Sequence, residues 1–189
     1  MSAVRSRWLS LFAAALLLLG GAMSAGADQG DPRLDALFDR LHVTPDPIEA
    51  QDIEGTIWRI WMTSDDDKVN GLMQIGVNAM GGEDFAGALS AFTRMVEIAP
   101  GFAEGWNKRA TVFYLVGDYA ASIADIDRTL ALEPRHFGAL SGLGLVRSAL
   151  DDEEAALAAF EKALAVNPHM PGARANAEEL RRRLKGRSI

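Results

Sequence analysis

The sequence predicts an all-α protein built from antiparallel helix pairs, and three observations support that prediction. Aromatic residues make up only 7% of the chain while Ala and Leu are frequent, which favours packed helices over a β-sandwich. With 49% hydrophobic and 24% charged residues, the chain can bury a core. Pro100, Pro134 and Pro168 recur at one interval of 34 residues. A short array of helical repeats is therefore expected.

The first residues have the order of a secretory signal peptide. Arg5 and Arg7 precede an apolar run over residues 8–19, and small residues follow it. This order predicts that segment 1–27 is removed by cleavage after Ala27 and that the mature protein is periplasmic. An uncleaved membrane anchor is the alternative, but the run is shorter than the roughly 20 residues that span a bilayer. No later segment is long and apolar, so stable membrane insertion of the mature chain is not expected.

Residues 28–68 predict a degenerate N-terminal helical hairpin. Asp31-Pro32 and Asp46-Pro47 each place a capping residue before a proline suited to the first helical position. Trp58 and Trp61 lie one 34-residue period before bulky positions of the next unit. The hairpin is therefore interpreted as an irregular repeat stacked on the first regular one. A cap that packs differently is an equal alternative.

Residues 69–168 form three units, 69–102, 103–136 and 137–168. Each unit predicts two helices, because small residues let paired helices approach, aspartates cap the second helix and prolines end it. The recurring positions are Gly76, Ala110 and Gly144; Asp84, Asp118 and Asp152; Ala88, Ser122 and Ala156; and Phe92, Ile126 and Phe160.

This pattern resembles the tetratricopeptide repeat, in which an apolar and small pair precedes a small residue, an aromatic residue and a closing proline. The resemblance implies a right-handed solenoid of antiparallel helix pairs that binds other polypeptides. Three residues depart from the pattern: Arg109 takes a usually apolar place, and Ala79 and Arg147 take usually aromatic ones.

Residues 169–189 predict a C-terminal capping helix and tail. Six basic residues against two acidic ones between 174 and 187 give a local charge of +4. Removing Arg5 and Arg7 leaves 17 of 19 basic residues against 26 acidic ones, a net charge of −9, so the rest of the mature chain carries −13. An acidic body argues against a nucleic-acid partner. The basic run is interpreted as a solvated helix face, with an anionic partner as the alternative.

No pattern in the sequence indicates an enzyme, a cofactor or a metal site. The chain has no cysteine, and its three histidines fall in separate turns that are expected to be solvated. Asp65–Asp67 lacks the glycine and the final acid of a calcium loop. No nucleophile elbow or phosphate-binding loop is present. An enzyme with a site invisible in sequence is the remote alternative.

The resemblance implies that the first helices of successive repeats line a concave, peptide-binding groove. Asn107 and Lys108 are expected to bond a peptide backbone, and Tyr114 offers apolar area with a polar tip, unless its ring only fills the seam between hairpins. Lys108 is expected to be exposed. The candidate peptide-binding residues are Met73, Val77, Asn107, Lys108, Thr111, Tyr114 and Ser141.

One subtype of the family holds a C-terminal carboxylate with Lys, Asn and Arg. Met73, Val77, Gly138 and Gly142 take most of those places here, so that clamp is not implied. The leading hypothesis is a periplasmic scaffold that binds a peptide or helix of an envelope protein. The alternative is a structural subunit of an envelope assembly that docks through the Trp58 and Trp61 hairpin.

Overall fold

The computed structural model describes residues 28–187, and the regular elements found there are all helices, which confirms the all-α fold class. The predicted signal peptide, 1–27, lies outside the described residues. In chain order the elements are η1 (Asp28–Gly30), α1 (Arg33–Val43), α2 (Pro47–Trp61), α3 (Asp67–Gly81), α4 (Phe85–Ile98), α5 (Ala103–Leu115), α6 (Tyr119–Leu132), α7 (Phe137–Ala149), α8 (Glu153–Val166) and α9 (Pro171–Arg187).

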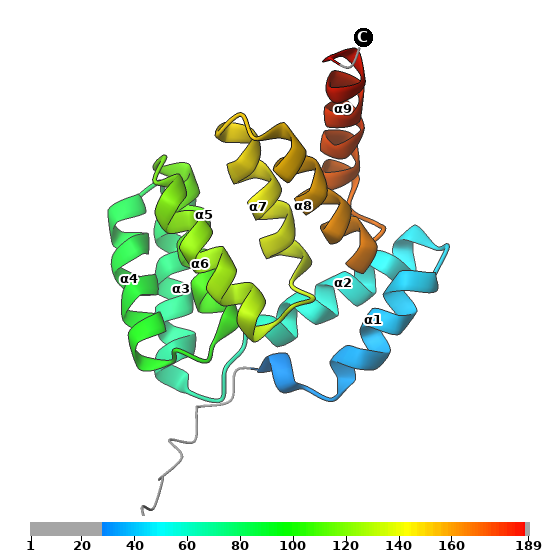
Figure 1. Ribbon diagram of the computed structural model, residues 1–189. Coiled ribbons are helices and arrows are strands. Elements are labelled where there is room, and N and C mark those ends of the chain that lie inside the picture. The colour runs from blue at the N-terminus through cyan, green and yellow to red at the C-terminus, as the bar shows by residue number, and fades with distance from the viewer. Residues whose placement is uncertain (1–27, 188–189) are drawn as a thin grey trace, which may run out of the picture.

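Three helix pairs, α3–α4, α5–α6 and α7–α8, follow one another, and α9 packs on the last of them (Figure 1). The second helix of each pair begins behind a capping aspartate. In each case a carboxylate oxygen accepts a hydrogen bond from the backbone N–H three residues later, at 2.9 Å for Asp84, 3.1 Å for Asp118 and 3.2 Å for Asp152. The predicted caps are confirmed.

The helices of a pair approach closely because a small residue faces a large one. A Cβ atom on Gly144 would lie 2.7 Å from the Phe160 ring, and one on Gly76 would collide with Phe92. Both rings are completely buried. In the central pair Ala110 replaces the glycine, and the Ser122 hydroxyl donates to its carbonyl oxygen at 2.9 Å. Close packing of this kind makes each pair a unit of the core.

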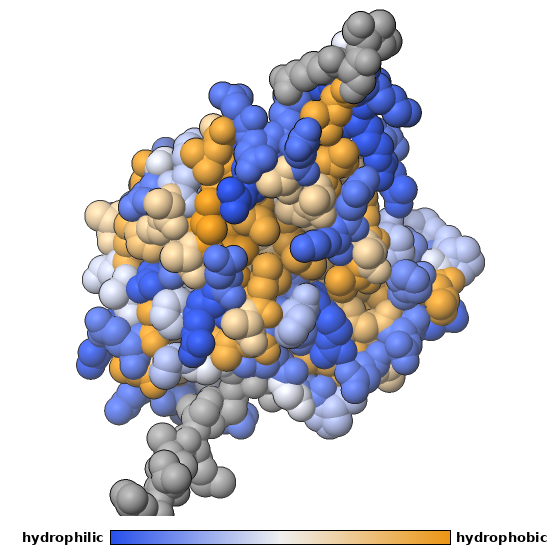
Figure 2. Space-filling view, in the orientation of Figure 1, coloured by the Kyte–Doolittle hydropathy of each residue, from blue (hydrophilic) through white to orange (hydrophobic). Residues whose placement is uncertain are grey.

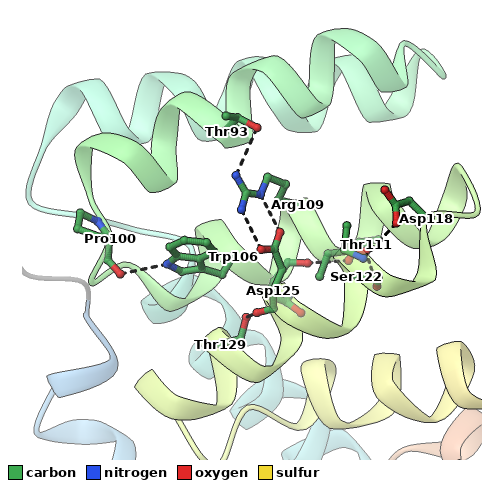
Figure 3. Close-up of polar contacts among 12 residues, drawn as sticks. Thr93, Pro100, Trp106, Arg109, Thr111, Asp118, Ser122, Asp125 and Thr129 are labelled. Carbon is green, nitrogen blue, oxygen red and sulfur yellow. Dashed lines mark hydrogen bonds and ion pairs between the residues drawn. The ribbon is translucent and has the colours of Figure 1, made fainter.

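The arginine at an apolar position of the central repeat is held by an ion pair. Nε and Nη2 of Arg109 donate to the two carboxylate oxygens of Asp125 at 2.7 and 2.8 Å (Figure 3). The guanidinium also lies 5.0 Å from the centre of the Trp106 ring, and the indole N–H donates to the Pro100 carbonyl at 3.0 Å. A bidentate pair with a ring beside it satisfies a largely buried cation.

The N-terminal hairpin packs against the third repeat and does not stack on the first, so of the two alternatives the structure agrees with the cap that packs differently. Figure 1 shows α1 and α2 beneath the lower ends of α7 and α8. The hairpin's apolar core is completed by Phe137 at the start of α7 and by Val166 and Met170 near the α8–α9 turn. Rings account for this placement, because Phe38 and Trp61 find an aromatic partner in Phe137, at centroid distances of 6.4 and 5.1 Å.

Polar bonds join the N-terminal segment to the two turns between successive pairs and to the turn between α8 and α9. They fix its position along the array, because each turn lies one repeat beyond the last. The bonds run from Gln29 Nε2 to the Gly101 carbonyl at 2.6 Å, from Arg135 Nη1 to Asp35 at 2.6 Å, from Asn167 to Glu54, and from His169 Nε2 to the Leu41 carbonyl at 3.1 Å.

The basic side chains of α9 are largely paired within the protein. Arg181 lies 2.8 Å from Glu161 of α8, while Arg182 and Arg183 both pair with Glu179 on α9 itself. These hydrogen-bonded pairs lower the pKa of Glu179 from its ordinary value, chiefly through Arg183. The pairing supports the interpretation of this helix as a solvated cap.

Candidate functional site

A cavity of about 230 Å³ lies between the inner helices α5 and α7. Four of the seven candidate residues line it: Asn107, Thr111, Tyr114 and Ser141. Apolar and small side chains complete its wall, from α5 (Ala110), α6 (Ser122, Ile126), α7 (Gly138, Gly142, Leu145, Val146) and the α8–α9 turn (Met170). The structure therefore brings the central and third repeats together around one hollow.

A second cavity, of about 360 Å³, adjoins the first and shares Ser141, Leu145 and Met170 with it. Its other walls come from α9 and from Glu54 and Trp58 of α2. We name the two together the inner groove. Figure 2 shows a band of hydrophobic surface over α7 with hydrophilic side chains on both sides. The inner groove is thus a composite of repeats and hairpin.

Met73 and Val77, the two candidates from the first repeat, lie apart from the inner groove. Met73 is 5% exposed in the core beneath Phe92, and Val77 packs against the same cluster. Neither residue lines either cavity. The first repeat therefore adds no candidate side chain to the hollow.

Lys108 is held inside the protein, so the expectation that it is exposed is wrong. Its ammonium nitrogen lies 3.1 Å from Glu104 Oε1 and 5.7 Å from the centre of the Trp58 ring. Only 22% of the side chain is exposed. Asn107 joins the same group, since its Nδ2 donates to Glu104 Oε2 at 3.0 Å. Both candidates hold a buried carboxylate, and Asn107 also lines the first cavity.

His136 is the third partner of Glu104, and the expectation of a solvated histidine is wrong here because its side chain is fully buried. Its Nδ1 accepts the backbone N–H of Ala139 at 3.0 Å and caps α7. Because Nδ1 accepts, the proton sits on Nε2, which donates to Glu104 Oε2 at 2.8 Å. The neutral imidazole stacks on Trp61 at 4.2 Å.

Glu104 is therefore ionised in the interior. Burial opposes its charge most strongly, but the hydrogen bond from His136 and the charge of Lys108 hold the pKa of the carboxyl below its ordinary value. Three partners around one buried carboxylate rigidify the start of α5 against α7. The Glu104 cluster (Glu104, Asn107, Lys108, His136) is thus a structural support beside the inner groove.

The sequence pattern did not predict Trp58 or Glu54 as groove residues. A Cβ on Gly138 would lie 2.6 Å from the Trp58 ring, so this glycine is what admits the indole beside α7. Gly142, one turn later, faces only Ile126 at 3.8 Å and leaves space open. Gly138, a glycine on a groove helix, was the available indication that a large side chain lies opposite.

Among the described residues, no group of three or more His, Asp or Glu side chains is arranged to hold a metal ion. None of the described helices combines the length and hydrophobicity needed to cross a bilayer.

Comparison with known proteins decides the family. No protein-family model matches the chain. A TPR repeat-containing protein of Rhizobium etli is 35% identical over 154 residues, which cover 82% of this chain and 76% of that protein. The chain belongs to the tetratricopeptide-repeat family. Its three regular pairs are accordingly tetratricopeptide repeats.

Solved structures share the fold of this tetratricopeptide-repeat protein. The Sgt2 TPR domain of Aspergillus fumigatus aligns with a TM-score of 0.62 and 22% identity, over 65% of this chain and 83% of that one. The first TPR domain of Spaghetti, solved with the HSP90 peptide SRMEEVD, gives 0.61 and 21%, over 64% and 96%. At this identity the likeness establishes the fold.

Proposed function

We propose that this protein is a non-catalytic interaction module that binds a peptide segment of a partner protein in the inner groove. The observation that carries the proposal is the pair of adjoining cavities of the inner groove, lined by Thr111, Tyr114, Ser141 and Leu145 among others. Binding sites are typically apolar hollows with a few polar groups that fix orientation. Peptide binding by structural neighbours such as the Spaghetti domain agrees with this role.

We further propose that the protein acts in the periplasm on an envelope partner. The proposal rests on the charged, apolar and small-residue order of segment 1–27. N-terminal sequencing of the protein from cells should find Asp28 first, in the periplasmic fraction. Met1 retained on a cytoplasmic protein would contradict export without touching the groove.

The structure weakens the alternative of docking through the two hairpin tryptophans. Trp61 is 2% exposed and stacked on His136, so it is not free to meet a partner. Trp58 already packs against Gly138. Trp58 is partly buried and lines the second cavity, so a partner that contacts it there would occupy the inner groove.

Site-specific photocrosslinking in cells tests the groove. A photoreactive residue at Leu145, which is 38% exposed in the groove wall, should capture a discrete partner. The same residue at Ile75, which is 58% exposed on α3, is the matched control. Gly142→Leu, which fills the first cavity, should abolish capture at 145. Capture that survives this substitution would place the partner elsewhere.

A further inference from the structure

Of the described residues that line the first cavity, none has a charged side chain. Ile126, Leu145 and Val146 give it an apolar floor, and Thr111, Tyr114 and Ser141 supply neutral polar groups. An apolar cavity of about 150 Å³ holds a benzene ring. At about 230 Å³, this cavity has room for one large apolar side chain such as Leu, Met or Phe.

Every cation on the two helices that bound this cavity is already paired with a carboxylate. On α5, Lys108 pairs with Glu104 at 3.1 Å and Arg109 with Asp125 at 2.7 Å. On α7, Arg147 lies 3.4 Å from Asp152. An incoming carboxylate would find no free cation here and would lose hydration without a partner, which is costly.

The second cavity offers the opposite charge. Among the described residues that line it, Glu54 is the one acidic side chain, and the other ionisable group, His169, donates its Nε2–H to the Leu41 carbonyl. Glu54 accepts a hydrogen bond from Asn167 through one carboxylate oxygen. A positively charged ligand group placed beside Glu54 would be attracted by its carboxylate.

Resting on the proposed function, we propose that the inner groove selects a neutral-to-basic peptide segment. The segment inserts one large apolar side chain between α5 and α7 and places a Lys or Arg beside Glu54. Acidic tails, of the kind seen on the Spaghetti domain, are rejected because the groove has no free cation for them. The hairpin thereby contributes to specificity through α2, since Glu54 and Trp58 are groove walls outside the repeats.

The experiment is selection from a random peptide library displayed on phage, with the full chain as bait. Enriched sequences should pair one large apolar residue with a nearby Lys or Arg, while the synthetic peptide SRMEEVD should not bind. Selected peptides are then measured by calorimetry on the wild type and variants. Gly142→Leu should weaken them about tenfold or more, because its side chain occupies the cavity.

Three further variants sharpen the result. Glu54→Gln keeps an acceptor for Asn167 but removes the charge, so basic peptides should bind several-fold more weakly and with less salt dependence. Leu145→Ser removes apolar contact in both cavities, and it replaces Gly142→Leu as the test variant if that protein does not fold. Gly71→Leu, on an open stretch of α3, is the matched control and should leave affinity unchanged.

Each outcome is decisive. If the selected peptides are acidic and bind Gly142→Leu or Leu145→Ser more weakly than the wild type, the proposed selectivity is wrong but the groove is still the binding site. Selected peptides that bind both variants as tightly as the wild type would overturn the groove function itself. A library that yields no binder would overturn both. If basic apolar peptides bind Glu54→Gln as tightly as the wild type, Glu54 is not part of the binding site.

Discussion

The repeat hairpins and the N-terminal hairpin are both antiparallel helix pairs, yet different forces position them. In a repeat, a residue such as Gly144 faces Phe160 sixteen positions later, so packing is set by the adjacent helix. The N-terminal hairpin instead reaches Phe137 and Asn167, far along the chain. A repeat is placed by its own sequence period, while the hairpin is placed by the surface that the assembled repeats offer.

The largest effect tests the repeat core. Phe160→Ala should lower the free energy of unfolding by about 3–5 kcal/mol, because the fully buried ring leaves a cavity against Gly144. Urea denaturation followed by far-UV circular dichroism measures it. An unchanged midpoint would mean that the helix pairing within repeats is misassigned.

The junction between the two regions comes next, because the Glu104 cluster lies beneath Trp61. Glu104→Gln should cost about 1.5–3 kcal/mol at neutral pH by removing the ionic partner of Lys108. The pKa of Glu104 is lowered in the folded protein, so the stabilisation is complete above about 4.5, its ordinary value, and is lost as pH falls through the folded-state pKa. The difference in the free energy of unfolding between wild type and variant should therefore become smaller as the pH is lowered.

The comparison of wild type with Glu104→Gln separates Glu104 and its direct partners from the other carboxylates. Other carboxylates with lowered pKa, such as Glu49 beside Arg40, are common to both proteins and cancel in the difference. A gap that is constant across the acid range would contradict an ionised Glu104.

A smaller change should loosen the hairpin alone. Gly138→Ala places a methyl group 2.6 Å from the Trp58 ring and should cost about 1–2 kcal/mol. Amide hydrogen exchange should rise in α1 and α2 and stay constant in α8. Gly142→Ala, one turn later with space around it, is the matched control. Equal protection of the hairpin in both variants would show that Trp58 does not hold it.

The smallest effect concerns the turns inside the repeats, where the backbone is left-handed at equivalent positions. Gly117 has φ 81°, while Glu83 has φ 59° and Asp151 has φ 57°. Glu83→Gly should stabilise by about 0.5–1 kcal/mol by relieving steric cost, and Asp151→Gly should gain less because Asp tolerates this region better. Thermal melts check both, and a lower melting temperature for Glu83→Gly would contradict the strain.

The same contrast between local and distant contacts separates what could be predicted about the site from what could not. Asn107, Thr111, Tyr114 and Ser141 were predicted because the resemblance to tetratricopeptide repeats implies that the first helix of each repeat lines the groove. Whether such a residue meets a ligand or another side chain depends on what lies across from it. That is why the sequence placed Lys108 on the groove but not against Glu104.

By itself, the sequence determined the helices, their caps and the three repeats, because each depends on contacts within about 34 residues. Only the tertiary structure decided where the hairpin lies and that Glu54 and Trp58 wall the groove. It also decided that His136 is a buried, neutral cap. These contacts join residues up to 128 positions apart, as His169 and Leu41 are. No local period encodes such pairs, since they form only once the repeats have stacked and created the surface that the hairpin covers.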